Sequence, residues 1–220
     1  MASDLFTQYR LTGVVLILAF IVFAIGAGLP FVGRKGDATI YMLTAPGNLQ
    51  AVAASLTFWR WGNNFMGTAI IVLLAGSSML TTLLQKAGEV TFSRLGLIGL
   101  IVAAVLWLIF SAFRGVATVR VAQEVAAAGT STTGAAPAYY APLAQWMFAL
   151  FFVYAALGFL ALAAYGASLL QVGLLPAWVG WATLIYSITL LIPLFIQGNS
   201  LPILHYLPGL LIGALLLFFG

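Results

Sequence analysis

Six long apolar runs dominate this sequence and limit what the chain can fold into. They cover approximately residues 11–32, 62–85, 95–113, 143–170, 175–196 and 202–219, and none contains Asp, Glu, Lys or Arg. A helix needs about 20 mostly apolar residues to cross the hydrocarbon core of a bilayer, and each run is close to that length. Hydrophobic residues make up 64% of the 220 residues, more apolar surface than a soluble domain of this size can bury. The sequence therefore predicts an integral membrane protein.

The fold class follows from the continuity of these runs. They lack the alternation of apolar and polar residues that marks the strands of a membrane barrel. We expect an all-α bundle of six transmembrane helices that forms a single domain over residues 1–220. Two connections are longer than the others, at 33–61 and 114–142, and each is predicted to hold a short interfacial helix. In the second, Arg120 and Glu124 stand four residues apart and are expected to pair.

Six spans place both termini on the same side of the membrane. The basic residues on the side of the two longer connections are Arg34, Lys35, Arg60, Arg114 and Arg120, against Arg10, Lys86 and Arg94 on the side of the termini. Because cytoplasmic loops carry an excess of Lys and Arg, this count places the longer connections in the cytoplasm.

One polar cluster interrupts the apolar pattern, in the segment TFWRWGNNF at the start of the second run. On a helix, Arg60, Asn63 and Asn64 share one face. They form either a collar at the membrane interface, with Trp59 and Trp61 at headgroup depth, or a pocket for a headgroup, a quinone or a small solute. In the collar interpretation each amide bonds to a neighbouring helix.

His205 is the only histidine, and it lies at the start of the last run. The simplest expectation is an interfacial side chain that bonds to a carbonyl or a headgroup. A role in proton handling or quinone binding, or as a lone axial ligand to a pigment or haem, stays open. His205, Arg60, Asn63 and Asn64 are therefore the candidate cofactor-binding residues.

Several chemistries are excluded by residue type. The chain has no cysteine, which removes disulfides and iron–sulfur ligation. A single histidine cannot supply paired haem ligands or a histidine-rich metal centre. The runs hold no Asp, Glu, Lys or Arg to carry protons or to couple an ion gradient. We thus predict no catalytic residues, no metal site and no enzymatic activity, and no cofactor is identifiable beyond a bound lipid, quinone or pigment.

Two motifs resemble those of a known family. RLTG at 10–13 and LLPAWVGWATLIYSI at 174–188 are similar to segments of an uncharacterised bacterial family of six-span membrane proteins of unknown function. That family usually has basic residues in the turn before the fifth span, whereas QVGL at 171–174 has none. The resemblance implies a bacterial inner (cell) membrane with both termini in the cytoplasm, opposite to the charge count. We follow the resemblance on this point. It supplies no catalytic residues.

Small residues suggest close packing between helices, as in GLLIG at 209–213. Together with the short turns, they favour a non-catalytic accessory or scaffold subunit of a larger membrane complex, respiratory or photosynthetic. Its partners would be membrane lipid, other membrane subunits and a lipid or pigment between them. The alternative is a small transporter or a solute- or lipid-binding membrane module. The net charge of +4 is spread over both faces and does not indicate nucleic acid.

Overall fold

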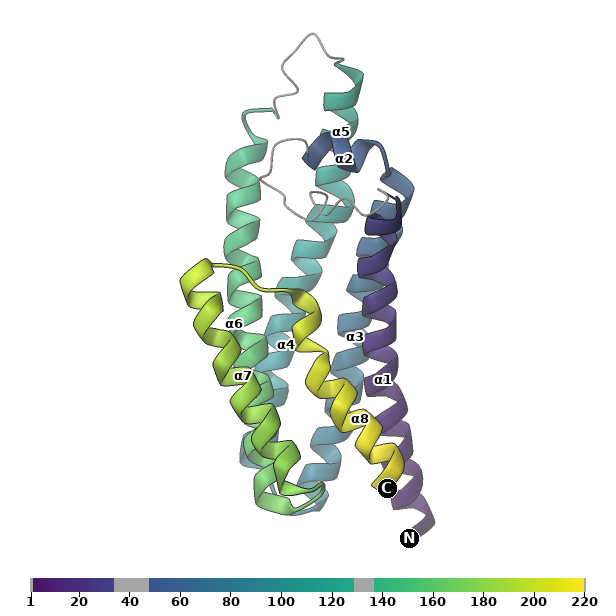
Figure 1. Ribbon diagram of the computed structural model, residues 1–220, viewed down its shortest axis with the longest axis vertical. Coiled ribbons are helices and arrows are strands. Elements are labelled where there is room, and N and C mark those ends of the chain that lie inside the picture. The colour runs from purple at the N-terminus through teal and green to yellow at the C-terminus, as the bar shows by residue number, and fades with distance from the viewer. Residues whose placement is uncertain (1, 34–47, 129–136, 220) are drawn as a thin grey trace. The chain divides into compact units, whose positions relative to one another are not determined.

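The computed structural model describes residues 2–33, 48–128 and 137–219. Every regular element in these ranges is a helix (Figure 1), which confirms the all-α class. The helices are α1 (Ala2–Gly33), α2 (Asn48–Ala53), α3 (Leu56–Lys86), α4 (Thr91–Ala112), a π-helical turn (Phe113–Ala117), α5 (Thr118–Ala127), α6 (Tyr140–Val172), α7 (Ala177–Gln197), a 3₁₀ turn (Pro202–His205) and α8 (Leu207–Phe219).

Five helical segments in the described part of the chain are long and apolar enough to cross a membrane. They contain the first four predicted spans and all but the first two residues of the fifth. Helix length therefore supports the integral membrane class as well as composition does. The sixth predicted span, 202–219, contains a shorter helix than expected. α8 has 13 residues and is about 20 Å long at 1.5 Å per residue, less than the roughly 30 Å of the hydrocarbon core. The preceding 3₁₀ turn brings this apolar segment to Pro202–Phe218.

The two predicted short helices have different origins. α2 is a separate helix of six residues that packs against α5 (Figure 1). α5 is not separate, because the third span continues through the π-helical turn and reaches Ala127 as one segment of 37 residues. The predicted pair on α5 is confirmed, with Arg120 Nε 3.3 Å from Glu124 Oε1.

The described packing divides into two compact units. Unit 1 comprises residues 1–21, 69–106 and 152–220, and unit 2 comprises residues 22–68 and 107–151. Helices α1, α3, α4 and α6 contribute residues to both units.

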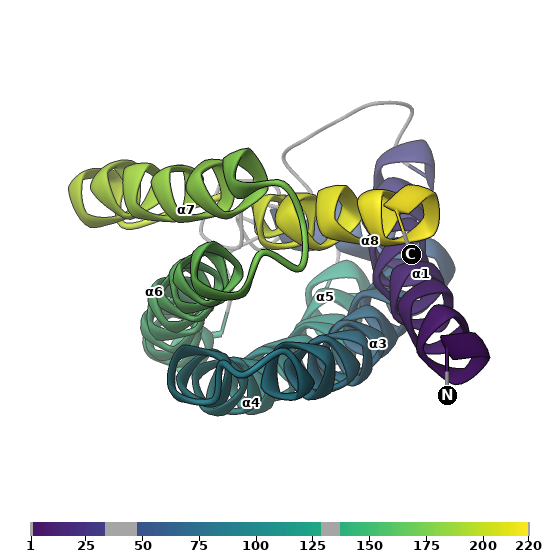
Figure 2. The ribbon, with the colours of Figure 1, turned by 90° about the horizontal axis from the view of Figure 1, so that it is seen from below.

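Helix crossings in unit 1 depend on glycine. A Cβ on Gly13 of α1 would lie 2.6 Å from the carbonyl oxygen of Gly213 on α8. A Cβ on Gly166 of α6 would lie 2.9 Å from that of Gly180 on α7. Only glycine permits such backbone contact, which is how helices associate where lipid gives no hydrophobic drive. Figure 2 shows α8 between α7 and α1 as a result.

Unit 2 has one such crossing and an aromatic core. A Cβ on Gly62 of α3 would lie 2.7 Å from the carbonyl oxygen of Gly26 on α1. Trp107 is fully buried, donates its indole N–H to the carbonyl of Met66 at 3.0 Å, and lies 6.1 Å from the ring of Phe23. A buried indole needs such an acceptor, because an unmet N–H in a dry interior is costly.

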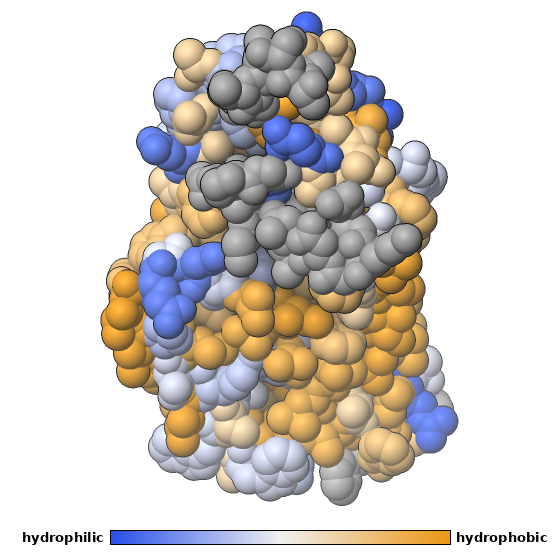
Figure 3. All heavy atoms as spheres, turned by 45° about the horizontal axis from the view of Figure 1, so that its top comes forward, coloured by the Kyte–Doolittle hydropathy of each residue, from blue (hydrophilic) through white to orange (hydrophobic). Residues whose placement is uncertain are grey.

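Apolar side chains cover much of the surface, and the face in Figure 3 shows hydrophilic residues only in small, separate patches. Trp61, Trp178 and Trp181 are more than half exposed, as expected of an interfacial belt. Trp59 is fully buried, so its predicted place in that belt is wrong. Residues two positions apart on a helix point about 200° away from each other. Trp59 and Trp61 therefore cannot both face lipid.

Candidate functional site

The four residues proposed from the sequence do not share one environment. Arg60 and Asn64 are exposed on α3, whereas Asn63 is buried in unit 2. His205 is buried in unit 1. Neighbouring residues on a helix differ in direction by about 100°, which explains why one asparagine points into the protein and the next one away from it.

The Asn63 side chain lies in a buried centre built around Arg114, a residue that is only 5% exposed. The guanidinium carbon of Arg114 lies 4.5 Å from the ring centroid of Trp59 and 5.5 Å from that of Phe110. Trp59 Nε1 donates a hydrogen bond of 2.7 Å to the backbone oxygen of Arg114. A desolvated cation on an aromatic face gains about 2 kcal/mol. The tryptophan thus binds both the side chain and the backbone of this arginine.

Local geometry leaves polar atoms beside this centre. Asn63 Nδ2 donates to the carbonyl of Trp59 at 2.8 Å, but Asn63 Oδ1 and Ser111 Oγ are buried and have no hydrogen-bond partner within the described residues. A Cβ on Gly115, in the π-helical turn, would lie 3.7 Å from the Asn63 Cβ. Single π-helical turns within α-helices occur frequently at functional sites. This region is the part of unit 2 best suited to hold a polar group.

His205 has a packing role in unit 1. Its ring stacks on Phe159 with centroids 4.0 Å apart, and a Cβ on Gly158 would lie 2.5 Å from its Cδ2. Nε2 lies 3.1 Å from the carbonyl oxygen of Ala155, and Nδ1 lies 3.3 Å from that of Pro202. A neutral imidazole has a single N–H and donates to one of these two carbonyls. A bond to a carbonyl is one of the expectations from the sequence, but it lies in the interior of the unit rather than at its surface.

Glu89 is a second buried charged residue, and like Arg114 it was not among the candidates proposed from the sequence. Glu89 lies in the turn between α3 and α4 and is 4% exposed. Its two carboxylate oxygens accept hydrogen bonds from the backbone N–H groups of Phe92 at 2.6 Å and Ser93 at 2.9 Å. The hydroxyl of Ser168 on α6 donates to Glu89 Oε2. The carboxylate thus caps the start of α4 and ties it to α6.

The protonation of Glu89 reflects these contacts. Burial alone raises the pKa of the carboxyl, but the hydrogen bonds from Ser168, Phe92 and Ser93 outweigh burial and hold the pKa below its usual value. Hydrogen bonds to the ionised form have this effect because they are lost on protonation. Glu89 is therefore an ionised structural acid at neutral pH. The sequence signal for it was an acidic residue directly before an apolar helix, which is typical of a helix start.

A network of hydroxyl groups continues from the Glu89 region. Ser93 Oγ donates to the Glu89 carbonyl at 3.2 Å, and Thr81 lies 2.8 Å from the hydroxyl of Tyr165. Tyr165 in turn donates to the carbonyl of Ser77 at 3.2 Å. These bonds join α3, α4 and α6 within unit 1. Fully partnered networks of this kind make a fold more rigid and specific.

Neither centre holds a cluster of metal-ligating side chains. The described residues contain no group of three or more His, Cys, Asp or Glu side chains able to hold a metal ion. Arg114 is bound by aromatic rings and Glu89 by hydrogen-bond donors, so each charge is held in place by its surroundings. Both centres hold neighbouring helices together. The centre in unit 2 also contains two oxygen atoms without a hydrogen-bond partner in the described residues, Asn63 Oδ1 and Ser111 Oγ.

Comparison with known proteins adds no relative: no family model, no curated protein and no solved structure matches the chain. The resemblance to the six-span bacterial family stays an expectation from the sequence. What the chain does must therefore be inferred from its surfaces and buried centres.

Proposed function

We propose that this chain is a non-catalytic accessory subunit of a larger membrane complex and that it binds another membrane protein through one face of α3. The observation that carries this proposal is the exposure of Asn64. Its side-chain amide has no hydrogen-bond partner among the residues described. Arg60, one turn earlier and about 6 Å along the helix axis, does not bond to it either. An amide facing lipid loses its hydrogen bonds to water, whereas a neighbouring helix can restore them.

The rest of this face supports the same interpretation. Exposed positions of α3 recur every three or four residues, at Arg60, Asn64, Thr68, Ile71, Ala75, Ser78 and Thr82. Thr68 and Thr82 donate to carbonyls of their own helix at 3.0 and 3.1 Å. Small and hydroxyl-bearing residues are the types that form helix–helix contacts in membranes. The face is therefore better matched to protein than to lipid tails.

The test is to substitute Asn64→Leu in the full chain and to extract it with its surrounding lipid in polymer-bounded discs. We expect the complex to lose its partner, because the interhelical hydrogen bonds of the amide are removed. Arg60→Lys is the matched control on the same face, since it keeps the charge and should keep the partner. If the wild-type chain is extracted alone, or if Asn64→Leu leaves the mass of the complex unchanged, the proposal is wrong.

A second function, a small transporter or solute-binding module, is favoured by the Arg114 centre. A buried arginine within a π-helical turn offers polar contacts that helix packing alone does not require. The same holds for Asn63 Oδ1 and Ser111 Oγ, which have no hydrogen-bond partner among the described residues. Saturable protection of the Arg114 region from hydrogen exchange by a small polar solute would support this function over the accessory role.

The proposed setting is a bacterial inner membrane with both termini in the cytoplasm, and the partner is a membrane protein rather than nucleic acid. Attachment of a membrane-impermeant reagent to a single cysteine placed at residue 2 or at residue 220 tests the topology. Labelling of both positions from the same side is expected, and labelling from opposite sides would contradict it.

A further inference from the structure

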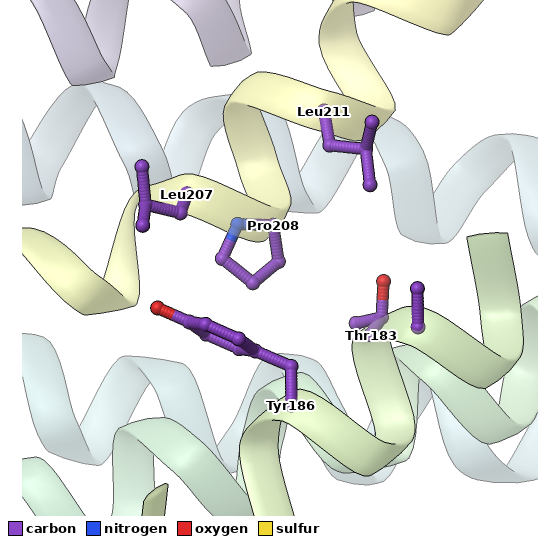
Figure 4. A pocket seen from close by; sticks show the side chains of 6 residues that line it. Thr183, Tyr186, Leu207, Pro208 and Leu211 are labelled. Carbon is purple, nitrogen blue, oxygen red and sulfur yellow. The ribbon is translucent and has the colours of Figure 1, made fainter.

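The two last helices of unit 1 enclose a groove of about 260 Å³. It is lined by Ala182, Thr183 and Tyr186 of α7 and by Leu207, Pro208 and Leu211 of α8 (Figure 4). Apolar atoms form most of this lining, and the hydroxyls of Thr183 and Tyr186 are its polar side-chain groups.

The Tyr186 hydroxyl is already used. It donates a hydrogen bond of 3.0 Å to the carbonyl of Leu204. Leu204 lies in the 3₁₀ turn before α8, and Pro208, four residues later, has no N–H to offer its carbonyl. Tyr186 therefore satisfies an acceptor that the proline leaves free.

The Thr183 hydroxyl has no such partner. Thr183 is 2% exposed, and its Oγ1 makes no hydrogen bond to any described residue. In Figure 4 this oxygen points from α7 toward α8, into the groove. A buried hydroxyl without a partner loses its hydrogen bonds to water and gains none in return, so an occupant of the groove that offers an acceptor would be favoured.

We propose that the groove binds one acyl chain of a membrane phospholipid, whose ester carbonyl accepts a hydrogen bond from Thr183. The apolar lining requires an apolar occupant, and the single free donor requires one acceptor on it. Pockets for small molecules usually measure about 300–1,000 Å³, so this groove of about 260 Å³ suits one segment of a chain whose remainder extends into the bilayer.

The depth of Thr183 agrees with an ester group. Trp181 is 55% exposed on the same helix, and exposed tryptophans lie at the level of the headgroups. Thr183 follows two residues later, about 3 Å further along the axis. That position is just inside the headgroup region, where the chains of a phospholipid are joined to glycerol.

The experiment uses the full chain in vesicles made from equal amounts of an ester-linked phospholipid and its ether-linked counterpart, with the same headgroup and chain length. Native mass spectrometry after mild detergent release then counts the lipids of each kind that stay bound. Only the ester lipid has the carbonyl. We expect the wild-type chain to retain it about fivefold more often, the preference that one hydrogen bond of ordinary net strength gives.

Three variants test the assignment. Thr183→Val keeps the shape and should retain both lipids equally, and Thr183→Ser should restore the preference. Ser187→Ala is the matched control: its hydroxyl donates to the Thr183 carbonyl at 2.7 Å, outside the groove, and the preference should persist. Circular dichroism checks that each variant is folded.

Two outcomes would overturn the proposal. One is equal retention of ester and ether lipids by the wild-type chain. The other is displacement of the bound ester lipid by an added short-chain quinone in wild type but not in Thr183→Val, which would make a quinone the occupant. Because the readout is bound lipid, neither outcome depends on whether α3 binds a partner chain.

Discussion

Two charged residues are buried in the described part of the chain, Glu89 in unit 1 and Arg114 in unit 2, and they are stabilised in different ways. Glu89 is surrounded by donors, since two backbone N–H groups and the Ser168 hydroxyl meet its carboxylate. Arg114 lies on the faces of Trp59 and Phe110. Around Glu89 the hydroxyls of Ser93 and Ser168 are bonded, whereas beside Arg114 the Ser111 hydroxyl has no partner in the described part of the chain.

This difference indicates different tasks. A partnered network fixes one arrangement of helices, and Glu89 is accordingly a structural residue. Unpaired oxygens next to a buried cation cost free energy unless something binds them. Of the two centres, a polar ligand or a buried water would therefore gain more at the one around Arg114.

The largest effect is expected from Trp59→Ala. The substitution removes a fully buried ring, its contact with the Arg114 guanidinium and its bond to the Arg114 carbonyl. We expect unfolding in detergent micelles to become easier by about 3–5 kcal/mol. Trp61→Ala, at an exposed position two residues away, should change it by under about 0.5 kcal/mol. Equal losses in the two variants would mean that the Arg114 centre is not a packed core.

Glu89→Ala comes next. It leaves the N–H groups of Phe92 and Ser93 and the hydroxyl of Ser168 without their acceptor, and the expected loss of stability is about 2–3 kcal/mol. Glu124→Ala is the control, because that carboxylate is exposed and its pair with Arg120 is worth under about 1 kcal/mol. Denaturant titration followed by tryptophan fluorescence measures both. A Glu124 effect as large as that of Glu89 would contradict the ranking.

Acid should weaken the Glu89 centre. The pKa of Glu89 in the folded chain lies below the ordinary value of 4.5, so its ionised form favours the folded state above that pH. This contribution is lost as the pH falls below about 4.5 and through the lower pKa of the folded state. Melting temperatures between pH 7 and pH 3 should fall less steeply for Glu89→Gln than for the wild-type chain. If the melting temperature of Glu89→Gln falls with pH as steeply as that of the wild-type chain, then Glu89 is not the cause of the acid sensitivity.

The smallest and most direct comparison uses two buried serines. Ser168→Ala removes a hydrogen bond to Glu89 and should cost about 1 kcal/mol. Ser111→Ala removes a hydroxyl that has no partner within the residues described, so it should be neutral or slightly stabilising. If thermal unfolding shows that Ser111→Ala destabilises the protein as much as Ser168→Ala, then Ser111 is already bonded to a water or a ligand.

Prediction of the site from the sequence was partial. Arg60, Asn63, Asn64 and His205 were selected because polar residues are rare in this chain, and Asn63 does lie beside a buried centre. Arg114 and Glu89 lie in the connections between the predicted spans, and no feature of the sequence indicates that they are buried. Burial of a residue at a span end depends on how the next helix packs, and a sequence pattern carries no such information.

Local sequence alone determined the helices. Apolar runs of about 20 residues have no other stable form in a bilayer, since backbone N–H and C=O groups in lipid must bond within their own segment. Tertiary structure decided the rest: that Trp59 is buried and Trp61 exposed, that the third span continues past Arg114, and that Thr183 points into a groove. These outcomes depend on contacts between helices far apart in the chain, and in a uniformly apolar sequence no hydrophobic pattern marks which face will meet protein and which will meet lipid.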